Sequence, residues 1–267
     1  MSRFHSAGEE ALWERVLLYL FARYAELPLL SLSFSLLRGK WKKLGQLPFL
    51  RFALGWTLAA PFARWADTAK PLPFPQVLEF LERVDGPIAV GPCRCRISHR
   101  ACSHPLETDI VIRSGVEAWT KAFPKDYRFI TFEEAKEIIS ECHNLGMWQM
   151  VFVHCPTYGN TEYVICNCCT CGCVPYILNR ELGQRVYPFI LGPYISKTDL
   201  TRCRGFGECV RACPFGARAV ENHRSYLKGL CFGCGRCVEV CPVEAITMVR
   251  RYESEEIHPG TVRSGTL

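Results

Sequence analysis

The 267-residue sequence predicts an α+β protein, and three observations support this fold class. Residues 1–70 are apolar and basic, and their long apolar runs are typical of helices. Residues 71–194 alternate helix and strand signals, which predicts a mixed α/β domain around a sheet. Residues 195–252 contain one cysteine frame twice, which predicts a small duplicated α+β domain. Residues 253–267 form a polar tail.

The first part contains two apolar runs around a basic cluster at Arg38–Lys43. Glu9–Leu27 predicts a helix, Leu30–Leu37 fits either a helix or a strand, and Leu47–Ala63 is the second apolar run. Neither run reaches about 18 residues without a charge or a proline, so we expect no membrane-spanning helix. Residues 11–65 are expected to lie in a membrane interface, to dock on a partner subunit, or to pack on the protein's own core.

The middle part begins with Pro71–Pro75, a proline-rich stretch that is expected to be extended. Helix and strand signals then follow in alternation, and the helix that starts after Thr131 has a capping box. The predicted elements are helix Gln76–Val84, strand Ile88–Val90, strand Thr108–Arg113, a helix from Thr131 to Leu145, and strand Trp148–His154.

Two cysteine groups stand at the ends of these elements. The first has the pattern C-x-C-x6-C and is followed by a His-Pro pair, and the second has five cysteines within eight residues. Their members are Cys93, Cys95, Cys102, Cys166, Cys168, Cys169, Cys171 and Cys173. Eight thiolates satisfy two [4Fe-4S] clusters, so one cluster, two clusters and a structural zinc are all open. Because Cys168 and Cys169 are adjacent, we expect them to belong to different sites or to include one cysteine that is not a ligand.

Four other cysteine and histidine residues could bind metal by residue type, but we expect them not to be ligands. Cys142 lies on the apolar face of a predicted helix and is expected in the core. Cys155 precedes a proline in a loop, and we expect it not to be a ligand. His104 and His154 are expected to be hydrogen-bonded scaffold residues.

The C-terminal part contains a C-x2-C-x2-C-x3-C-P run from Cys231 to Pro242. This spacing is typical of iron–sulfur proteins, in which three cysteines of one loop bind one cluster and the fourth binds the neighbouring cluster. An upstream run from Cys203 to Pro214 has the same frame, but Phe206 replaces its second cysteine. A zinc knuckle is the alternative, although zinc does not need the third cysteine or the following x3-C-P.

On these motifs, the segment from Ile195 to Arg251 resembles a bacterial-type two-cluster ferredoxin domain. The resemblance implies that one [4Fe-4S] cluster is bound by Cys213, Cys231, Cys234 and Cys237. It implies that the other cluster is bound by Cys203, Cys209 and Cys241. Because Phe206 leaves this second site one thiolate short, three outcomes are open: a [3Fe-4S] cluster, a [4Fe-4S] cluster with an open iron, or an empty site filled by the phenyl ring.

A wider resemblance covers Gly86 to Arg251. Larger ferredoxin-like iron–sulfur proteins carry a C-x-C-x6-C-x-His-Pro segment, a CNCC-type run and then a ferredoxin domain. The matching residues here are Cys93, Cys95, Cys102, His104, Pro105 and Cys166 to Cys169. A further cysteine often falls where this chain has Asp109, which leaves the ligand set of this region open.

Seventeen cysteines indicate either disulfides in a secreted protein or metal thiolates in a reducing compartment. The polar, acidic segment Met1–Glu10 lacks the features of a signal peptide, so we expect the cytoplasm or the cytoplasmic face of the inner membrane, in an anaerobe or a low-potential pathway. The net charge of +6 does not indicate nucleic acid, because bound clusters would offset it and no nucleic-acid motif is present.

The expected function is electron transfer through at least two [4Fe-4S] clusters, with a [3Fe-4S] cluster as one outcome at the second site. We expect a subunit or partner of a larger, membrane-associated redox complex rather than a free-standing catalyst, because the sequence has no dinucleotide-binding motif and no P-loop. A reductase with an open iron and a zinc-stabilised scaffold are the alternatives. Four arginines near the first run are expected to tune a cluster, to dock an acidic partner or to be solvated: Arg202, Arg204, Arg211 and Arg218.

Overall fold

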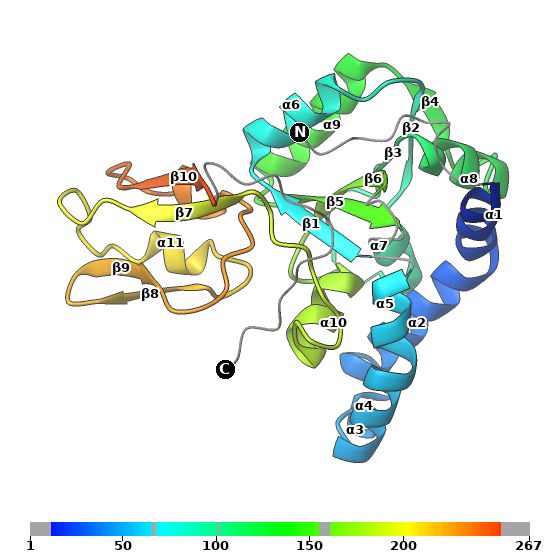
Figure 1. Cartoon of the computed structure of the whole chain (residues 1–267), viewed down its shortest axis with the longest axis horizontal. Helices are drawn as coiled ribbons and strands as arrows, with labels where there is room; N and C mark the ends of the chain where they lie inside the picture. Colours follow the sequence, from blue (N-terminus) through cyan, green and yellow to red (C-terminus); the bar gives the residue numbers. More distant parts are fainter. Residues whose placement is uncertain (1–11, 66–67, 101, 155–160, 252–267) are drawn as a thin grey trace.

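The computed structural model describes residues 12–65, 68–100, 102–154 and 161–251. Helices and antiparallel sheets are both present, so the fold is an α+β mix, as the sequence predicts (Figure 1). Cys155 and the predicted tail at 253–267 lie outside the described residues.

A six-stranded sheet forms the centre of the molecule, with strand order β1-β5-β6-β3-β2-β4 and antiparallel pairing throughout the described strands. Alternate residues face opposite sides, so Ile110 and Val151 enter one core cluster while Val111 and Met150 enter the other. The strands are β1 (Thr68–Leu72), β2 (Ile88–Pro92), β3 (Glu107–Val111), β4 (Arg128–Ile130), β5 (Trp148–His154) and β6 (Thr161–Cys168).

Helices cover both faces of this sheet. Helices α6 (Phe74–Glu82) and α9 (Phe132–Asn144) supply apolar side chains to the core on one face. Thr131 caps α9, because its hydroxyl accepts a hydrogen bond from the Glu134 amide at 3.2 Å, as the capping box predicts. The other face carries α8 (Ser114–Ala122) and α10 (Val174–Leu182), and the short helix α7 (Arg94–His99) packs against the N-terminal helices.

The N-terminal part is helical, and Leu30–Leu37, which fits either a helix or a strand by sequence, is helical in the structure. Each of its two π-helical segments stands shortly before a proline, Pro28 or Pro61. Proline lacks an amide hydrogen and its ring crowds the carbonyl four residues earlier, which a wider turn relieves. The elements are α1 (Leu12–Leu20), η1 (Phe21–Ala25), α2 (Glu26–Leu37), α3 (Lys42–Gly45), α4 (Pro48–Leu54), η2 (Gly55–Ala59) and α5 (Ala60–Trp65).

One helix in the described residues meets a criterion for membrane spans, although the sequence leads us to expect no membrane-spanning helix. Elements α1, η1 and α2 join into a helix of 26 residues, Leu12–Leu37, that is long and apolar enough to cross a membrane by length and composition alone. The helix continues through Arg23 in the π-helical segment and through Glu26 and Pro28 in α2, although these residues interrupt the apolar run in the sequence. Length and composition do not decide the matter, because core helices and signal sequences meet the same criterion.

One side of this long helix packs on the sheet domain. Leu18 and Ala22 are buried in the main core, and Glu26 forms an ion pair with Arg94 at 2.8 Å. Phe34 stacks on His99, with ring centroids 3.7 Å apart. The chain then returns to the sheet through β1, which crosses the predicted domain boundary at residue 70.

The C-terminal residues form a smaller unit on the side of the sheet domain opposite to α1 and α2 (Figure 1). Strand β7 pairs with β10 and β8 pairs with β9, so two β-α-β halves face each other. Gly207 and Gly235 take equivalent positions, with φ of +83° and +81°, and each precedes a short helix. The elements are β7 (Tyr194–Thr198), α11 (Glu208–Arg211), β8 (Arg218–Glu221), β9 (Arg224–Leu227), α12 (Arg236–Glu239) and β10 (Ile246–Arg250).

An aromatic contact region joins the two units. Phe215 and Phe232 of the C-terminal unit pack together at 4.7 Å, and Phe215 meets Trp148 edge-on at 5.9 Å. Tyr176 of α10 donates a hydrogen bond to the Pro214 carbonyl at 2.6 Å. The buried rings and this hydrogen bond fix the C-terminal unit against the end of the sheet domain.

Candidate metal centres

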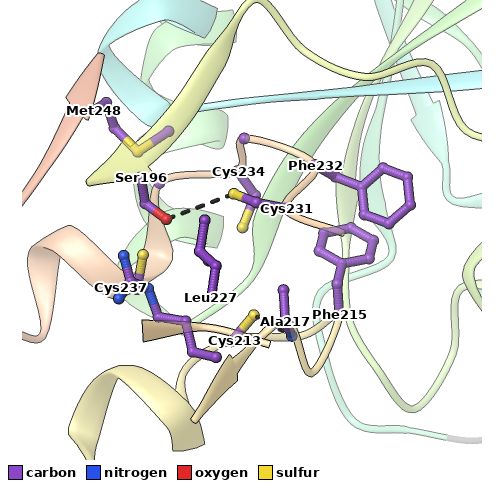
Figure 2. Close-up of a pocket in the computed structure, with 13 residues that line it drawn as sticks. Ser196, Cys213, Phe215, Ala217, Leu227, Cys231, Phe232, Cys234, Cys237 and Met248 are labelled. Atoms are coloured by element: carbon purple, nitrogen blue, oxygen red, sulfur yellow. Dashed lines mark hydrogen bonds between the residues drawn. The ribbon is translucent and has the colours of Figure 1, made fainter. Parts of the chain in front are cut away.

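Four cysteines line one cavity in the C-terminal unit (Figure 2). Cys231, Cys234 and Cys237 come from the loop before α12 and from the start of α12, and Cys213 comes from the other half, where it follows α11. The pseudo-twofold arrangement of the halves brings Cys213 across to the other three. This is the set that the ferredoxin resemblance implies for the first cluster.

Hydrogen-bond donors and a buried cation surround these thiols. The Ala217 amide donates to Cys213 Sγ at 3.3 Å, and Ser196 Oγ lies 3.6 Å from Cys231 Sγ. Arg218 also lines the cavity and is only 1% exposed. Its Nη1 donates to Thr198 and Ser225, while Nε and Nη2 are buried without a partner among the described residues. Unpaired donors at a wall of thiols fit an anionic group, such as an iron–sulfur cluster held by thiolates.

Burial and charge act in opposite directions on these thiols. Burial raises the pKa of Cys234 far above its ordinary value, and burial also raises the pKa of Cys237. The nearby Arg218 guanidinium opposes the increase at Cys237 by stabilising a thiolate. Ligand cysteines must be deprotonated, so metal binding here releases protons that burial would otherwise retain.

The second cavity contains the three other predicted cysteines, Cys203, Cys209 and Cys241. Two backbone amides donate to its sulfurs: Ser225 N–H to Cys203 Sγ at 3.3 Å, and Ala245 N–H to Cys241 Sγ at 3.2 Å. The latter repeats the contact of Ala217 with Cys213 in the other half. The environment therefore suits thiolate ligands in both halves.

Phe206 stands at the edge of this second cavity and is 56% exposed. A phenyl ring that filled the position of the missing thiolate would be buried, so the ring does not fill the site. The structure thus argues against an empty site that Phe206 closes, and a three-thiolate site stays the prediction.

The eight N-terminal cysteines divide into two groups. The first, here called the five-thiol group, is a continuous series of side-chain hydrogen bonds from Cys93 through Cys95, Cys173 and Cys168 to Cys166. Burial opposes ionisation of Cys173, but hydrogen bonds from Cys168 and Cys95 outweigh it and lower its pKa to about 7. Cys173 also stands at the N-terminus of α10, where the helix dipole favours an anion.

The second group consists of Cys102, His104, Cys169 and Cys171, here called the Cys3His group. Their ligand atoms all lie within 4.8 Å of one another. The sequence predicts only a scaffold role for His104, but in the structure its Nδ1 lies 3.6 Å from Cys171 Sγ. The side chain of His154 is not described, and Cys142 is buried next to Cys169, as a core residue is expected to be.

A buried arginine lies between the two groups. Arg96 is 1% exposed, and it donates hydrogen bonds to the Asn167 carbonyl and the Thr108 hydroxyl. Burial lowers its pKa, but Cys93, Cys168 and Cys169 act as anions and raise it overall. The sequence reasoning missed this residue, although its position directly after Cys95 inside the cysteine pattern was a signal. Arg96 and its unpartnered Nε fit metal-bound thiolates on both sides.

Asp109 is a second residue whose place the sequence left open. Cys166 Sγ donates to Asp109 Oδ1 at 3.4 Å, and the Tyr127 hydroxyl donates to Oδ2 at 2.6 Å. Burial raises the pKa of Asp109, and both hydrogen bonds oppose that increase. Asp109 thus occupies the edge of the five-thiol group, where the resembling proteins often have a further cysteine.

Comparison with protein families identifies a 4Fe-4S binding domain (Fer4) at residues 226–247. This match covers all four cysteines of the run from Cys231 to Cys241. The chain therefore carries an iron–sulfur, ferredoxin-like segment that supports a [4Fe-4S] cluster and electron transfer. Comparisons with curated proteins and with solved structures gave no match.

Proposed function

We propose that the chain transfers electrons through several iron–sulfur clusters, as a subunit or partner of a larger redox complex. The observation that carries this proposal is the cavity of Cys213, Cys231, Cys234 and Cys237, in which both halves of the repeat contribute thiols beside the buried Arg218. A cluster bound there supplies one-electron transfer, and the chain supplies the thiolates, the N–H donors and the burial that set its potential.

The five-thiol group is proposed to hold a further [4Fe-4S] cluster. Its five sulfurs exceed the four that a cluster needs, so at least one of the five thiols is a neighbour rather than a ligand. Cys168 and Cys173 belong to the same core cluster as Phe215, Phe232 and Cys234. Continuous packing between the two thiol groups is what an electron path through the protein requires.

A reductase is the second candidate function, and the exposure of Phe206 favours it. A site with three thiolates and an open edge would leave one iron of a [4Fe-4S] cluster free to bind a small substrate. The distinguishing measurement is the EPR spectrum of the reduced protein before and after addition of a small ligand. A shift supports the reductase, and an unchanged spectrum supports pure electron transfer.

The N-terminal helices are proposed to bring the chain to the cytoplasmic face of a membrane. Large apolar side chains are exposed along them, among them Leu12, Tyr24, Phe49 and Phe52. Exposed lysines and Trp41 lie beside these residues, and such a mixture suits an interface with anionic lipid. Helix α2 meets the cysteine region through the stack of Phe34 on His99, which would place the metal groups near the membrane surface.

The decisive experiment measures iron and acid-labile sulfide in the anaerobically purified chain, together with an EPR redox titration. The wild-type protein is expected to contain at least two clusters. Cys234→Ser is expected to lose one of them, and Cys142→Ser, a buried thiol outside both cavities, is the matched control. Iron and sulfide near zero in the wild type would refute the proposal, as would equal contents in Cys234→Ser and Cys142→Ser.

A further inference from the structure

Four ligand atoms converge where the loop after α7 meets the turn between β6 and α10. Cys102 Sγ lies 3.8 Å from Cys169 Sγ, and Cys169 Sγ lies 3.3 Å from Cys171 Sγ. His104 Nδ1 lies 3.6 Å from Cys171 Sγ. These are the residues of the Cys3His group, and no pair of their ligand atoms is more than 4.8 Å apart.

These distances match the coordination shell of one metal ion. With Zn–S bonds of about 2.3 Å and Zn–N bonds of about 2.0 Å, tetrahedral geometry separates the ligand atoms by roughly 3.5 Å. In an iron–sulfur cubane each thiolate binds a different iron, so its four ligand atoms surround a much larger object. We propose that Cys102, His104, Cys169 and Cys171 bind a single Zn²⁺, separate from the iron–sulfur sites.

The chemistry of the four ligands agrees with this choice. Three thiolates and one imidazole form a closed, four-coordinate set that is typical of structural zinc. Magnesium and calcium prefer oxygen ligands, and the group offers none. The site therefore has no position for substrate, and its role is to hold two parts of the chain together.

Adjacent cysteines separate this site from the five-thiol group. Cys168 Sγ makes its hydrogen bonds with Cys166 and Cys173, whereas Cys169 Sγ contacts Cys102 and Cys171. The zinc assignment thus removes Cys102, Cys169 and Cys171 from the predicted iron–sulfur ligands and leaves a complete set for one cluster. Arg96 lies beside thiols of both groups and offsets their negative charge.

The surroundings show what the ion would stabilise. A Cβ atom at Gly172 would lie 3.0 Å from Cys102 Sγ and 3.4 Å from Cys169 Sγ, so a larger residue here would crowd the thiols of the group. The Gly172 carbonyl lies 3.0 Å from His99 Nε2, and Arg38, the residue directly after α2, donates to the Thr170 carbonyl at 3.1 Å. Zinc would therefore fix the turn against which α2 docks.

The test measures zinc, iron and sulfide in the full-length chain after anaerobic purification and dialysis against a chelator. The wild type is expected to retain one zinc per chain. Cys171→Ser and His104→Ala are expected to lower zinc affinity at least about tenfold and to leave iron and sulfide unchanged. Cys142→Ser, which removes the buried thiol next to the group, is expected to keep the zinc. Cobalt exchanged into the site should show thiolate charge-transfer absorption that Cys171→Ser weakens.

Three results would overturn the proposal: a wild type without zinc, zinc that Cys171→Ser and His104→Ala both retain, or a loss of iron and sulfide in both variants. The last result would make the group part of an iron–sulfur site with a histidine ligand. His104→Ala changes a half-exposed side chain, so it keeps the test valid if Cys171→Ser does not fold. If the proposed electron-transfer function were wrong but the zinc site were correct, the wild type would contain zinc and no iron, which differs from all three results above.

Discussion

Arg218 lies against Cys237 with its guanidinium buried and two of its nitrogens unpartnered. The same relationship recurs in the sheet domain, where Arg96 lies beside Cys169 with Nε unpartnered. Neither arginine forms a salt bridge with a carboxylate in the described part of the chain. A buried cation without a counter-charge is costly, so both sites need ionised thiols, and metal binding is what ionises them.

Replacing Arg218 should lower the reduction potential of the adjacent cluster. Reduction adds negative charge, which the guanidinium stabilises. Arg218→Gln should remove about 1.4 kcal/mol of this stabilisation, which lowers the reduction potential by roughly 60 mV. An EPR-monitored redox titration measures this shift. Arg202→Gln is the control, because Arg202 is exposed and pairs with Glu244 at 3.4 Å. Equal potentials in Arg218→Gln and the wild type would show that Arg218 is only a packing residue.

Supplying the missing thiol should complete the second site. Phe206→Cys is expected to raise iron by one per chain and to remove any [3Fe-4S] signal of the oxidised protein, because the fourth position gains a thiolate. Phe206→Ser removes the ring without adding a strong ligand, so it separates the effect of losing the phenyl ring from the effect of gaining a thiolate. Iron analysis and EPR of both variants measure the outcome, and identical iron contents would contradict it.

Much of the C-terminal unit was predictable because its spacing rules are strict. The repeated frame indicated two equivalent halves, and Cys213 does line the cavity of the second run. The sequence also predicted strand Trp148–His154 within its observed bounds and the cap at Thr131. Short elements such as β4 and α7 were missed, since three to six residues give too little periodicity to detect.

The adjacency of Cys168 and Cys169 predicted that these two thiols could separate, but spacing did not predict which other cysteines each of them would join. This grouping depends on the antiparallel pairing of β3 with β6, which brings Asp109 opposite Cys166, and on the turn after Cys168. Periodicity indicates which residues are buried but not which strands pair. The membership of the two cysteine groups could therefore be assigned only from the structure. The first part of the long helix was predicted, but its continuation to Leu37 stayed open, because the alternating pattern of Leu30–Leu37 fits a helix and a strand equally.

Glu26 should be essential for docking the N-terminal helix. Its carboxylate pairs with buried Arg94 at 2.8 Å and accepts a hydrogen bond from Trp119 Nε1 at 3.3 Å. Glu26→Ala leaves the arginine without this partner, so the free energy of unfolding should fall by about 3 kcal/mol. Urea unfolding of the anaerobic holo-protein measures this. Glu79→Ala breaks an exposed pair with Arg83 and should cost less than about 1 kcal/mol. Similar midpoints for the two variants would contradict the prediction.

The outer face of the N-terminal helices should bind anionic lipid vesicles. Phe49 and Phe52 are exposed on α4, next to Arg51 and the basic α3. Phe49→Ser combined with Phe52→Ser should lower the vesicle partition at least about a hundredfold, because each buried phenyl contributes about 1.5–3 kcal/mol and 1.4 kcal/mol corresponds to tenfold. Flotation with vesicles measures the partition.

A matched control for this surface lies in the sheet domain. Phe129 on β4 is as exposed as Phe52, at 66%, but it lies outside the N-terminal helices. Phe129→Ser should therefore leave flotation unchanged. Added salt should weaken wild-type binding, since exposed basic residues such as Lys42 and Lys43 contribute through screened charges. A wild type that does not float, or equal losses in Phe129→Ser and the double variant, would instead assign the apolar face to a protein partner.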